Sequence, residues 1–435
     1  MTSPRSIASE GTAVVGAPAE VAGEAAPIKW GKVDSFAGNS TSAALTTHRA
    51  CPVCGSDRAR TVLQFDQFQF YSDSDKLPKR IDLREVQCLD CFALYLNPCY
   101  SEYGFQVLFA EAGCSYGSTA GHTQEQIDWL GARGLLRSGS RFLDAGCYDG
   151  SFLARLPDNL ERIGMDIDGP AIERGRRRLG QKVQFIHGDF ENFRVSHPLD
   201  TITMFHVLEH LPRPAGVLRN LRSMAHAGTR LIVEVPLLEH GITNDINGFF
   251  SIQHTTHFSR ISLQNCLASA GWRIQESKQQ EDYNGFRVVA IPAEPVDMPE
   301  KDLHAVALTH EYFAAWHQAL HNVERRLWSI SIEDTPRCIL WGGGAHSEFL
   351  YQTTSFFQRS PEREYAIVDS DPLKKGKSWR GITISSPDSL REISWTDVCL
   401  LVSSYGSQPG IAKAAVDLGV PPERIITLYE TLRVY

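Results

Sequence analysis

The segment Arg141-Phe-Leu-Asp-Ala-Gly-Cys-Tyr-Asp-Gly150 decides the fold of this chain. Phe142 and Leu143 predict a buried strand that ends at Asp144, and after a tight turn Gly150 opens the next helix. This order is typical of the first strand-turn-helix unit of a nucleotide-binding α/β sheet, in which glycines let a ligand lie against the backbone.

The turn indicates which kind of cofactor would bind. It lacks the G-x-G-x-x-G spacing whose backbone amides cradle a pyrophosphate, and a carboxylate, Asp144, stands at the strand end instead. S-adenosylmethionine (SAM) has no phosphate and carries a cationic amino-acid portion, so it fits this turn better than a dinucleotide does. We expect Gly146 and Gly150 to lie against SAM, with Cys147 filling space in the turn as a neutral thiol.

Three later strand ends carry side chains that suit the rest of this cofactor. The second predicted strand ends in Asp166, whose carboxylate can accept both ribose hydroxyls. The third ends in Asp189 and Phe190, which suit the adenine amino group and ring face. The fourth runs into His206 at the lip of the site.

In this order the four motifs resemble those of the class I SAM-dependent methyltransferases. The resemblance implies a central Rossmann-like α/β domain at residues 121–293 and an enzyme that transfers the methyl group of SAM. An NAD-type or degenerate nucleotide fold is the alternative. The fourth motif, His206-Val-Leu-Glu-His210, looks like the generic form of many O-, N- and C-methyltransferases and does not choose among them.

Length and composition limit the remaining functions. A chain of 435 residues should hold two or three domains, and its net charge of −8 argues against a nucleic-acid partner. No apolar run approaches the length that spans a membrane, and the N-terminus lacks the apolar core of a signal peptide. We therefore expect a cytoplasmic monomer or weak homo-oligomer. Residues 1–46, rich in Ala, Gly, Ser and Thr, are predicted to be a disordered leader.

Two cysteine pairs predict a metal site in residues 47–120. Cys51-Pro-Val-Cys54 and Cys88-Leu-Asp-Cys91 are C-x-x-C pairs with 33 residues between them, and two such pairs complete a tetrahedral thiolate site for zinc. The rival is a redox dithiol, which would need only one pair near a β-α unit. A closed four-cysteine site leaves no open position, so the zinc would be structural, in a small β domain.

Residues 301–435 predict a third unit, a small Rossmann-like α/β domain. Trp316, Val323 and Leu327 have helical spacing, and a later strand runs into Gly342-Gly-Gly344. A second cofactor site at these glycines and Asp369 is one interpretation. We favour the other, in which this domain braces the methyltransferase and borders the substrate cleft.

The order of the three units resembles that of the sugar C-methyltransferases of deoxysugar antibiotic pathways, over residues from about 50 to 435. The most specific match is Gly-Cys-Tyr-Asp-Gly150, close to the family's Gly-Ser/Cys-Asn-Asp-Gly, with Tyr148 in place of Asn. The resemblance implies a nucleotide-linked 3-keto sugar bound between domains. It also implies deprotonation next to the ketone, followed by attack of the enolate carbon on the SAM methyl group.

The resemblance also places a catalytic base on an insertion at residues 237–260. The segment at 249–259 resembles the family's Tyr-His-Glu-His-Leu-Ser-Tyr-Phe-Ser, which puts the base on His254, with His257 as a second candidate on the same lid. Gln253 stands where the family has glutamate, and Ser251 where it has tyrosine. O- or N-methylation of a sugar or natural-product intermediate stays open, because it needs a base only for a hydroxyl or amine. A non-catalytic SAM-binding protein is the third possibility.

Overall fold

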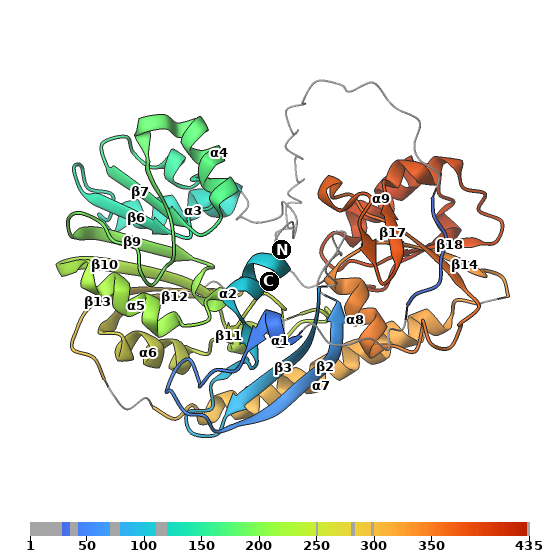
Figure 1. The fold of residues 1–435 in the computed structure, drawn as a ribbon, viewed down its shortest axis with the longest axis horizontal. Helices are drawn as coiled ribbons and strands as arrows, with labels where there is room; N and C mark the ends of the chain where they lie inside the picture. Colours follow the sequence, from blue (N-terminus) through green and yellow to red (C-terminus); the bar gives the residue numbers. More distant parts are fainter. Residues whose placement is uncertain are drawn as a thin grey trace, which may run out of the picture.

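The computed structural model describes residues 28–34, 42–69, 79–109, 120–248, 251–279, 283–296, 300–331 and 333–432 (Figure 1). A seven-stranded sheet lies at one end of the molecule and a six-stranded sheet at the other (Figure 1). A four-stranded antiparallel sheet and a long helix, α7, run beneath and between them (Figure 1). The predicted α/β class is confirmed.

The seven-stranded sheet is built around the opening segment of the sequence. Its strand order is β12-β13-β10-β9-β6-β7-β8, with β6 parallel to β7 and β9, and β13 antiparallel to both of its neighbours. The strands are β6 (Arg141–Ala145), β7 (Glu161–Asp166), β8 (Gln184–His187), β9 (Leu199–Phe205), β10 (Ala225–Pro236), β12 (Trp272–Gln279) and β13 (Gly285–Pro292). This mixed sheet is the Rossmann-like sheet that the four motifs predicted.

Helices cover both faces of this sheet because its strands are apolar on both sides. Phe142 packs into a core with α3 and α4, whereas its neighbour Leu143 packs on the opposite face with α5 and α6. The helices are α3 (Ala120–Ala132), α4 (Gly169–Leu179), α5 (Pro214–Ser223) and α6 (Arg260–Ser269). Asp168 caps α4 by accepting a hydrogen bond from the Ala171 amide at 2.8 Å, which fixes the helix directly after β7.

The N-terminal unit is a four-stranded sheet in the order β11-β4-β3-β2. Its elements are α1 (Ser42–Leu45), β1 (Thr46–Thr47), β2 (Ala59–Gln69), β3 (Arg80–Cys88), β4 (Leu94–Leu96), β5 (Cys99–Tyr100) and α2 (Glu102–Phe109). The remaining strand, β11 (Thr256–His257), comes from the insertion and pairs with β4. The predicted lid is therefore joined to the N-terminal sheet by backbone hydrogen bonds.

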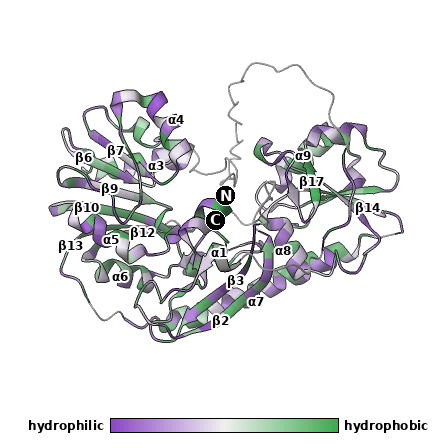
Figure 2. Cartoon of the chain, viewed as in Figure 1, coloured by the Kyte–Doolittle hydropathy of each residue, from purple (hydrophilic) through white to green (hydrophobic). Residues whose placement is uncertain are grey.

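The C-terminal sheet has the order β16-β17-β15-β14-β18-β19 and contains the predicted glycine turn. Its strands are β14 (Arg337–Trp341), β15 (Glu364–Val368), β16 (Ser378–Trp379), β17 (Ile382–Ser385), β18 (Val398–Val402) and β19 (Ile425–Ile426). Helices α8 (Ala345–Thr353) and α9 (Gln408–Asp417) belong to this unit. In Figure 2, β14 and β17 are largely green, as expected for a buried sheet, whereas the solvent-facing α4 is largely purple.

Helix α7 (Leu303–Trp328) joins the N-terminal and C-terminal units through one apolar core. Trp316 of α7 lies in this core with Phe65 of β2 and Phe349 of α8, and the ring centroids of Phe65 and Phe349 are 5.4 Å apart. Helix α7 contains Trp316, Val323 and Leu327, whose spacing predicted a helix in this part of the chain. The two units are therefore braced against each other along one helix.

The disordered leader predicted for residues 1–46 needs a correction. Gly31 pairs with Tyr365 beside β15 through two backbone hydrogen bonds of 2.8 and 2.9 Å, and Trp30 lies under the Arg337 guanidinium. Leu45 of α1 is fully buried. A few large apolar side chains anchor residues 28–34 and 42–46, which a composition average does not reveal; residues 1–27 and 35–41 lie outside the described residues.

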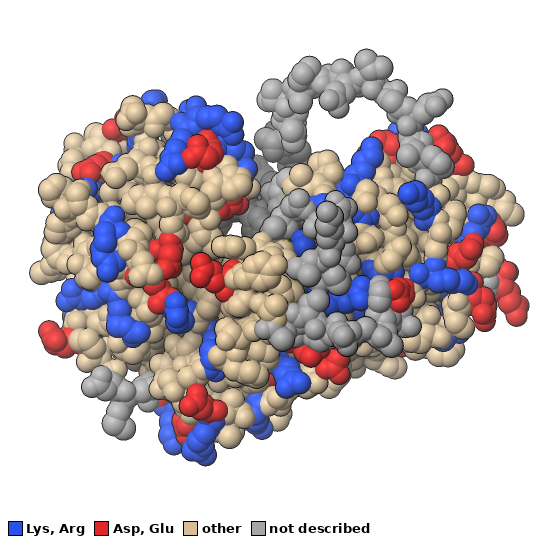
Figure 3. All heavy atoms as spheres, in the orientation of Figure 1, with Lys and Arg blue, Asp and Glu red and all other residues tan. Residues whose placement is uncertain are grey.

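Charged side chains of both signs are interspersed on the face drawn in Figure 3. The main basic group there lies over α4, whose last turn carries Arg176, Arg177 and Arg178. Two arginines of this helix contact the turn at residues 146–150, the predicted cofactor turn. Arg174 donates to the Tyr148 hydroxyl at 3.0 Å, and Arg178 donates to the Asp149 carbonyl at 2.9 Å. Among the described helices, none combines the length and apolarity needed to cross a bilayer.

Candidate active site at the carboxyl ends of the strands

The cofactor turn after β6 requires its glycines for packing as well as for a ligand. Gly146 has φ +93°, and a Cβ atom there would lie 2.3 Å from a methyl group of Val207, which follows β9. Gly150 has φ +75°, and its Cβ would lie 2.6 Å from the Phe185 ring. The turn is therefore pressed against the fourth motif on one side and the third strand on the other.

Asp144 lies almost fully buried in β6 and accepts a hydrogen bond from the Thr203 hydroxyl at 2.7 Å. Burial raises the pKa of Asp144 to about 7, against the opposing effect of this hydrogen bond. Next to it, burial and then the Asp144 carboxylate raise the pKa of Cys147, so that thiol is neutral and fills space against Gly164. The strand that leads into the turn thus carries a carboxyl group, Asp144, whose charge changes near neutral pH.

Asp166 stands at the end of β7, opposite the turn. Its carboxylate accepts from the Tyr148 amide at 2.7 Å and from the Asp168 amide at 2.9 Å. Burial raises the pKa of Asp166 in spite of these two hydrogen bonds. The structure therefore brings Asp166 to the predicted edge of the sheet and ties it to the turn.

The residues predicted for the adenine end differ in exposure. Asp189 is exposed and accepts a hydrogen bond from the Glu191 amide at 2.9 Å. Phe190 is 7% exposed and packs in the core that α5 and α6 share with the sheet. Their backbone follows β8 at the same edge as Asp166, as the order of strands predicted.

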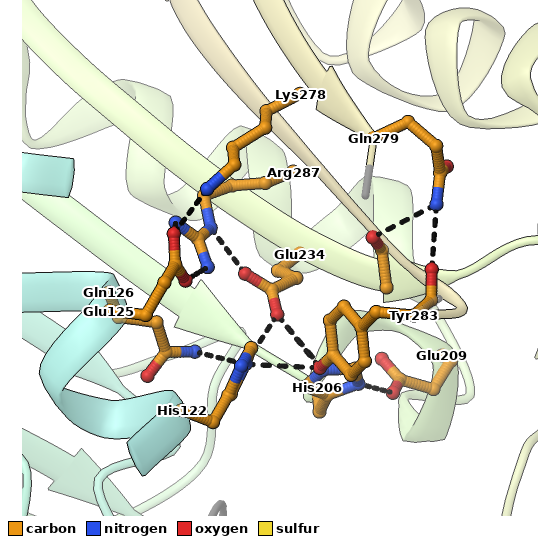
Figure 4. A network of polar contacts seen from close by, with 11 residues as sticks. His122, Glu125, Gln126, His206, Glu209, Glu234, Lys278, Gln279, Tyr283 and Arg287 are labelled. Carbon is orange, nitrogen blue, oxygen red and sulfur yellow. Dashed lines mark hydrogen bonds and ion pairs between the residues drawn. The ribbon is translucent and has the colours of Figure 1, made fainter. Parts of the chain in front are cut away.

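A polar network that the motifs did not predict lies beside His206 (Figure 4). At its centre is Glu234 of β10, with 1% of its side chain exposed. It accepts from Tyr283 at 3.0 Å and contacts His122 of α3 at 2.9 Å and His206 at 3.2 Å, while Arg287 donates to its other oxygen. The sequence does contain one indication of this network, a glutamate within the apolar residues 231–235 of β10. A buried charge of this kind requires partners.

The network determines the charge of His206. Burial lowers its pKa, but the neighbouring carboxylates Glu209 and Glu234 outweigh burial and raise that pKa to about 10. The same partners act in reverse on Glu234, whose pKa is held well below its usual range although burial opposes this. His206 therefore carries a proton at neutral pH, which suits a positioning role better than that of a base.

His254, the predicted base, lies beside the fourth motif. Its ring centroid is 4.9 Å from that of His210, at an interplanar angle of 73°. The lid is held there because the Thr255 amide donates to the Glu209 carbonyl at 2.8 Å. Burial, followed by the proximity of His210, lowers the pKa of His254 well below its usual value. The insertion thus brings His254 to Glu209 and His210.

His257, the second predicted base, is placed differently. Its side chain is fully buried, and its Nε2 atom lies 3.1 Å from the carboxylate of Glu85, a residue of β3. It belongs to β11, which pairs with β4 of the N-terminal sheet. In this position His257 helps to join the lid to the N-terminal sheet.

The four cysteines of the two C-x-x-C pairs come together. Their sulfur atoms all lie within 4.8 Å of one another, with Cys51 and Cys91 at 3.6 Å and Cys54 and Cys88 at 3.6 Å. The amides of Asp90 and Cys91 lie 3.4 and 3.5 Å from the Cys88 sulfur. Sulfur ligands of a tetrahedral zinc ion at about 2.3 Å are separated by roughly 3.8 Å, so the cluster has the dimensions of such a site.

The glycine turn of the C-terminal sheet is satisfied by its own chain. Asp369 accepts from the Gly343 amide at 2.8 Å and from the Lys374 ammonium group at 2.9 Å. A Cβ atom at Gly342 would lie 2.5 Å from the Ser403 carbonyl oxygen, so packing alone requires that glycine. These contacts favour the bracing role over a second cofactor site.

The comparisons with known proteins find a match in the part of the chain that forms most of the seven-stranded sheet. Residues 121–277 match the family described as a methyltransferase domain. A mitochondrial ubiquinone biosynthesis O-methyltransferase of Schizosaccharomyces pombe is 28% identical over 107 residues, which are 22% of this chain and 38% of that protein. A ubiquinone biosynthesis O-methyltransferase of Aeromonas salmonicida is 28% identical over 120 residues, 25% of this chain and 48% of that protein.

The solved structures similar to this chain include a magnesium protoporphyrin IX methyltransferase from Synechocystis with bound SAH. It is 22% identical, with a TM-score of 0.32, and the match covers 44% of this chain and 95% of that one. The chain spans less than half the length of the two curated relatives that it matches. The matched residues contain strands β6 to β10, most of β12 and the turn after β6, and they end before β13. The family match therefore supports a methyltransferase domain in the middle of this chain, as the four motifs predicted.

Proposed function

We propose that the chain transfers the methyl group of SAM to an oxygen atom of a small-molecule acceptor. The observation that carries this proposal is the cluster of Glu209, His210 and His254, which lies just beyond Val207, the residue that contacts the cofactor turn. The cluster offers polar side chains to an acceptor at the carboxyl ends of the strands. The similarity to ubiquinone biosynthesis O-methyltransferases supports oxygen as the acceptor atom.

In this proposal the sequence-predicted residues hold SAM along the edge of the sheet. Asp144 faces the amino-acid portion, with Gly146, Cys147 and Gly150 forming the turn, Asp166 binding the ribose, and Asp189 and Phe190 lying at the adenine. The fit rests on Asp144, which lies just before the turn, and on the Asp166 carboxylate, which accepts from the Tyr148 amide within it. When bound, SAM supplies an electrophilic methyl group. The chain would position the acceptor, with His206 beside the cofactor and His254 as the candidate base.

The pH dependence of SAM binding tests the role of Asp144. Because burial holds a proton on this carboxyl up to about pH 7, the charged form appears only as the pH rises. We expect SAM affinity to increase roughly tenfold per pH unit below 7 and then level off, until the cofactor's own amino group loses its proton near pH 8. Calorimetric titrations from pH 5.5 to 8 measure this, and Asp144→Asn should remove the rise. An equally steep rise in that variant would exclude Asp144 as its source.

Asp166→Asn tests the ribose site. The variant keeps the size of the side chain and loses its charge, so two charge-assisted hydrogen bonds become neutral ones, and SAM affinity should fall roughly 30- to 150-fold. Asp168→Asn is the matched control, because asparagine caps α4 as well as aspartate does. Equal SAM affinity in the Asp166 variant and the wild type would remove Asp166 from the site.

A second candidate is the C-methylation of a nucleotide-linked keto sugar, as the three-part resemblance implies. The observation that favours it is the position of His254, which the insertion brings to the fourth motif. The two candidates are separated by incubating a nucleotide-linked keto sugar with the chain in D₂O without SAM. Carbon chemistry requires exchange of the proton next to the ketone, whereas transfer to oxygen leaves that proton in place.

Product analysis tests the principal proposal. The full chain is incubated with SAM carrying a ¹³C-labelled methyl group and a panel of catechols, phenols and hydroxylated nucleotide sugars. A labelled methoxy group in the product is the expected result. A label attached to carbon would replace the proposal with the second candidate.

We further propose that Cys51, Cys54, Cys88 and Cys91 hold a structural zinc ion and that the chain divides into a zinc domain at 47–120, the methyltransferase at 121–293 and a C-terminal domain at 301–435. The support is the separation of the four sulfur atoms and the small apolar core around them. Zinc bound by four thiolates has no open coordination position, so it would maintain the fold and take no part in the chemistry.

A further inference from the structure

Glu209 is a buried carboxylate that accepts no hydrogen bond of normal length within the described part of the chain, although the protonated His206 lies 3.5 Å away. Its side chain is 1% exposed, and no hydrogen bond among the described residues reaches either carboxylate oxygen. The neighbouring nitrogens are His206 Nδ1 at 3.5 Å and His210 Nε2 at 3.8 Å, both beyond ordinary hydrogen-bond length. A buried carboxylate whose oxygens accept no hydrogen bond of normal length is costly, and this open acceptor capacity indicates a cation that binds beside it.

The orientation of His210 points to the same position. Its Nδ1 atom lies 3.0 Å from the Gln253 carbonyl, which can only accept, so Nδ1 carries the proton. In the neutral ring Nε2 then presents a lone pair, and that atom faces Glu209. A backbone carbonyl that fixes the tautomer of one ring nitrogen is the usual outer-shell partner of a metal-binding histidine.

His254 completes a set of three ligands. The ligand atoms of Glu209, His210 and His254 all lie within 4.8 Å of one another. The lid that carries His254 is held in place, since the Thr255 hydroxyl donates to the Leu211 carbonyl at 2.9 Å and the Thr255 amide to that of Glu209. An ion with ligands at about 2.1 Å would draw these atoms together by roughly 1 Å, within the reach of side-chain rotation.

A second group of three, His122, His206 and Glu234, has similar separations but a different electrostatic state. There the carboxylate already accepts from Tyr283 and from the Arg287 guanidinium. Its charge is balanced by the chain itself. Glu234 thus has short hydrogen bonds from Tyr283 and Arg287, whereas among the described residues Glu209 has only the longer ion pair with His206 and keeps acceptor positions open.

We propose that Glu209, His210 and His254 bind a divalent transition-metal ion such as Zn²⁺, Mn²⁺, Fe²⁺ or Co²⁺. Two imidazoles and one carboxylate suit these ions better than Mg²⁺ or Ca²⁺, which prefer oxygen ligands. Three protein ligands leave coordination positions open, and an acceptor oxygen can occupy one of them beside the cofactor turn. This use of the ion rests on the proposed transfer to oxygen. It makes His254 a ligand and replaces its role as base.

Cobalt replacement separates this site from the four-cysteine site. Four thiolates give Co²⁺ intense charge-transfer absorption, whereas nitrogen and oxygen ligands give only weak d–d bands. The full chain produced with Co²⁺ should show both signals and bind one ion more than the thiolate cluster holds. Glu209→Gln and His254→Ala should lose the weak bands and that additional ion, and change SAM affinity by less than about twofold.

His226→Gln is the matched control. His226 contacts Asp200 of β9 and lies at the start of β10, away from the proposed ion site, so this variant should keep the additional ion. Absence of the additional ion from the wild type, or its persistence in Glu209→Gln, overturns the proposal. Full methyl transfer to an oxygen acceptor after the ion is removed by a chelator also overturns it. If the ion binds as expected but the labelled methyl group is found on carbon, the ion site stands and the proposed function fails.

Discussion

Replacing Cys88 by serine should abolish binding of the proposed zinc ion and unfold the N-terminal unit. Cys88 ends β3, and its sulfur lies 3.6 Å from that of Cys54, in the turn that also carries Cys51. The apolar core at this end of the sheet is small, so the metal would supply much of its stability. Structural zinc ions bind with apparent free energies of about 10–16 kcal/mol, and most of that would be lost.

The measurements are metal content by plasma mass spectrometry and thermal unfolding by circular dichroism. Cys99→Ala is the control, because Cys99 is buried in the same unit, in β5, outside the cluster of four sulfur atoms. That variant should retain the zinc. A wild-type chain that purifies without metal and still unfolds cooperatively would contradict the zinc proposal.

The effect should extend to the active site. β3 pairs with β4, and β4 pairs with β11, which follows His254 by two residues. Loss of the N-terminal sheet therefore releases the lid, whereas the SAM turn lies in a different sheet. We expect Cys88→Ser to lose methyl transfer while retaining SAM binding.

Glu234→Gln should lower the stability of the methyltransferase domain by about 3–5 kcal/mol, because it removes one partner of a buried ion pair. Arg287 is 3% exposed and would keep only Glu125 as a charged partner. The loss corresponds to a fall in melting temperature of roughly 10 °C for a domain of this size. Scanning calorimetry measures it directly.

An exposed ion pair provides the control for this variant. Arg133 and Glu276 form a salt bridge whose side chains are 30% and 43% exposed, so Glu276→Gln should change stability by under about 1 kcal/mol. Equal melting temperatures for the two variants would show that the network around Glu234 does not stabilise the domain. The pKa of Glu234 is depressed below 4.5, so its contribution is complete above about pH 4.5 and declines as the pH falls through that lowered pKa.

Local patterns were sufficient to predict the sheet and the edge where its functional residues lie. Asp144 and Asp166 end apolar strands, and the carboxyl ends of parallel strands meet at one edge. Their positions beside the turn followed from that rule. The clustering of Cys51, Cys54, Cys88 and Cys91 also followed from their spacing, because each C-x-x-C turn places two sulfur atoms close together.

Features that depend on contacts between distant segments were not predictable from local patterns. Glu234 meets His122 and Tyr283 only because α3 and the residues just before β13 fold onto the same end of β10. His257 was assigned to the lid, but its pairing with β4 buries it in another sheet. Trp30 and its neighbours were hidden by the polar composition around them. In each case a tertiary contact decided the outcome.

Calorimetric titration of the full chain with SAM, and separately with NAD, tests the central claim most directly. Asp144 lies just before a turn without a pyrophosphate cradle, and the Asp166 carboxylate accepts a hydrogen bond from the Tyr148 amide of that turn. The account predicts that SAM binds at one site per chain, that Asp166→Asn weakens it at least tenfold, and that NAD gives no binding heat. Binding of NAD with no heat from SAM would contradict it.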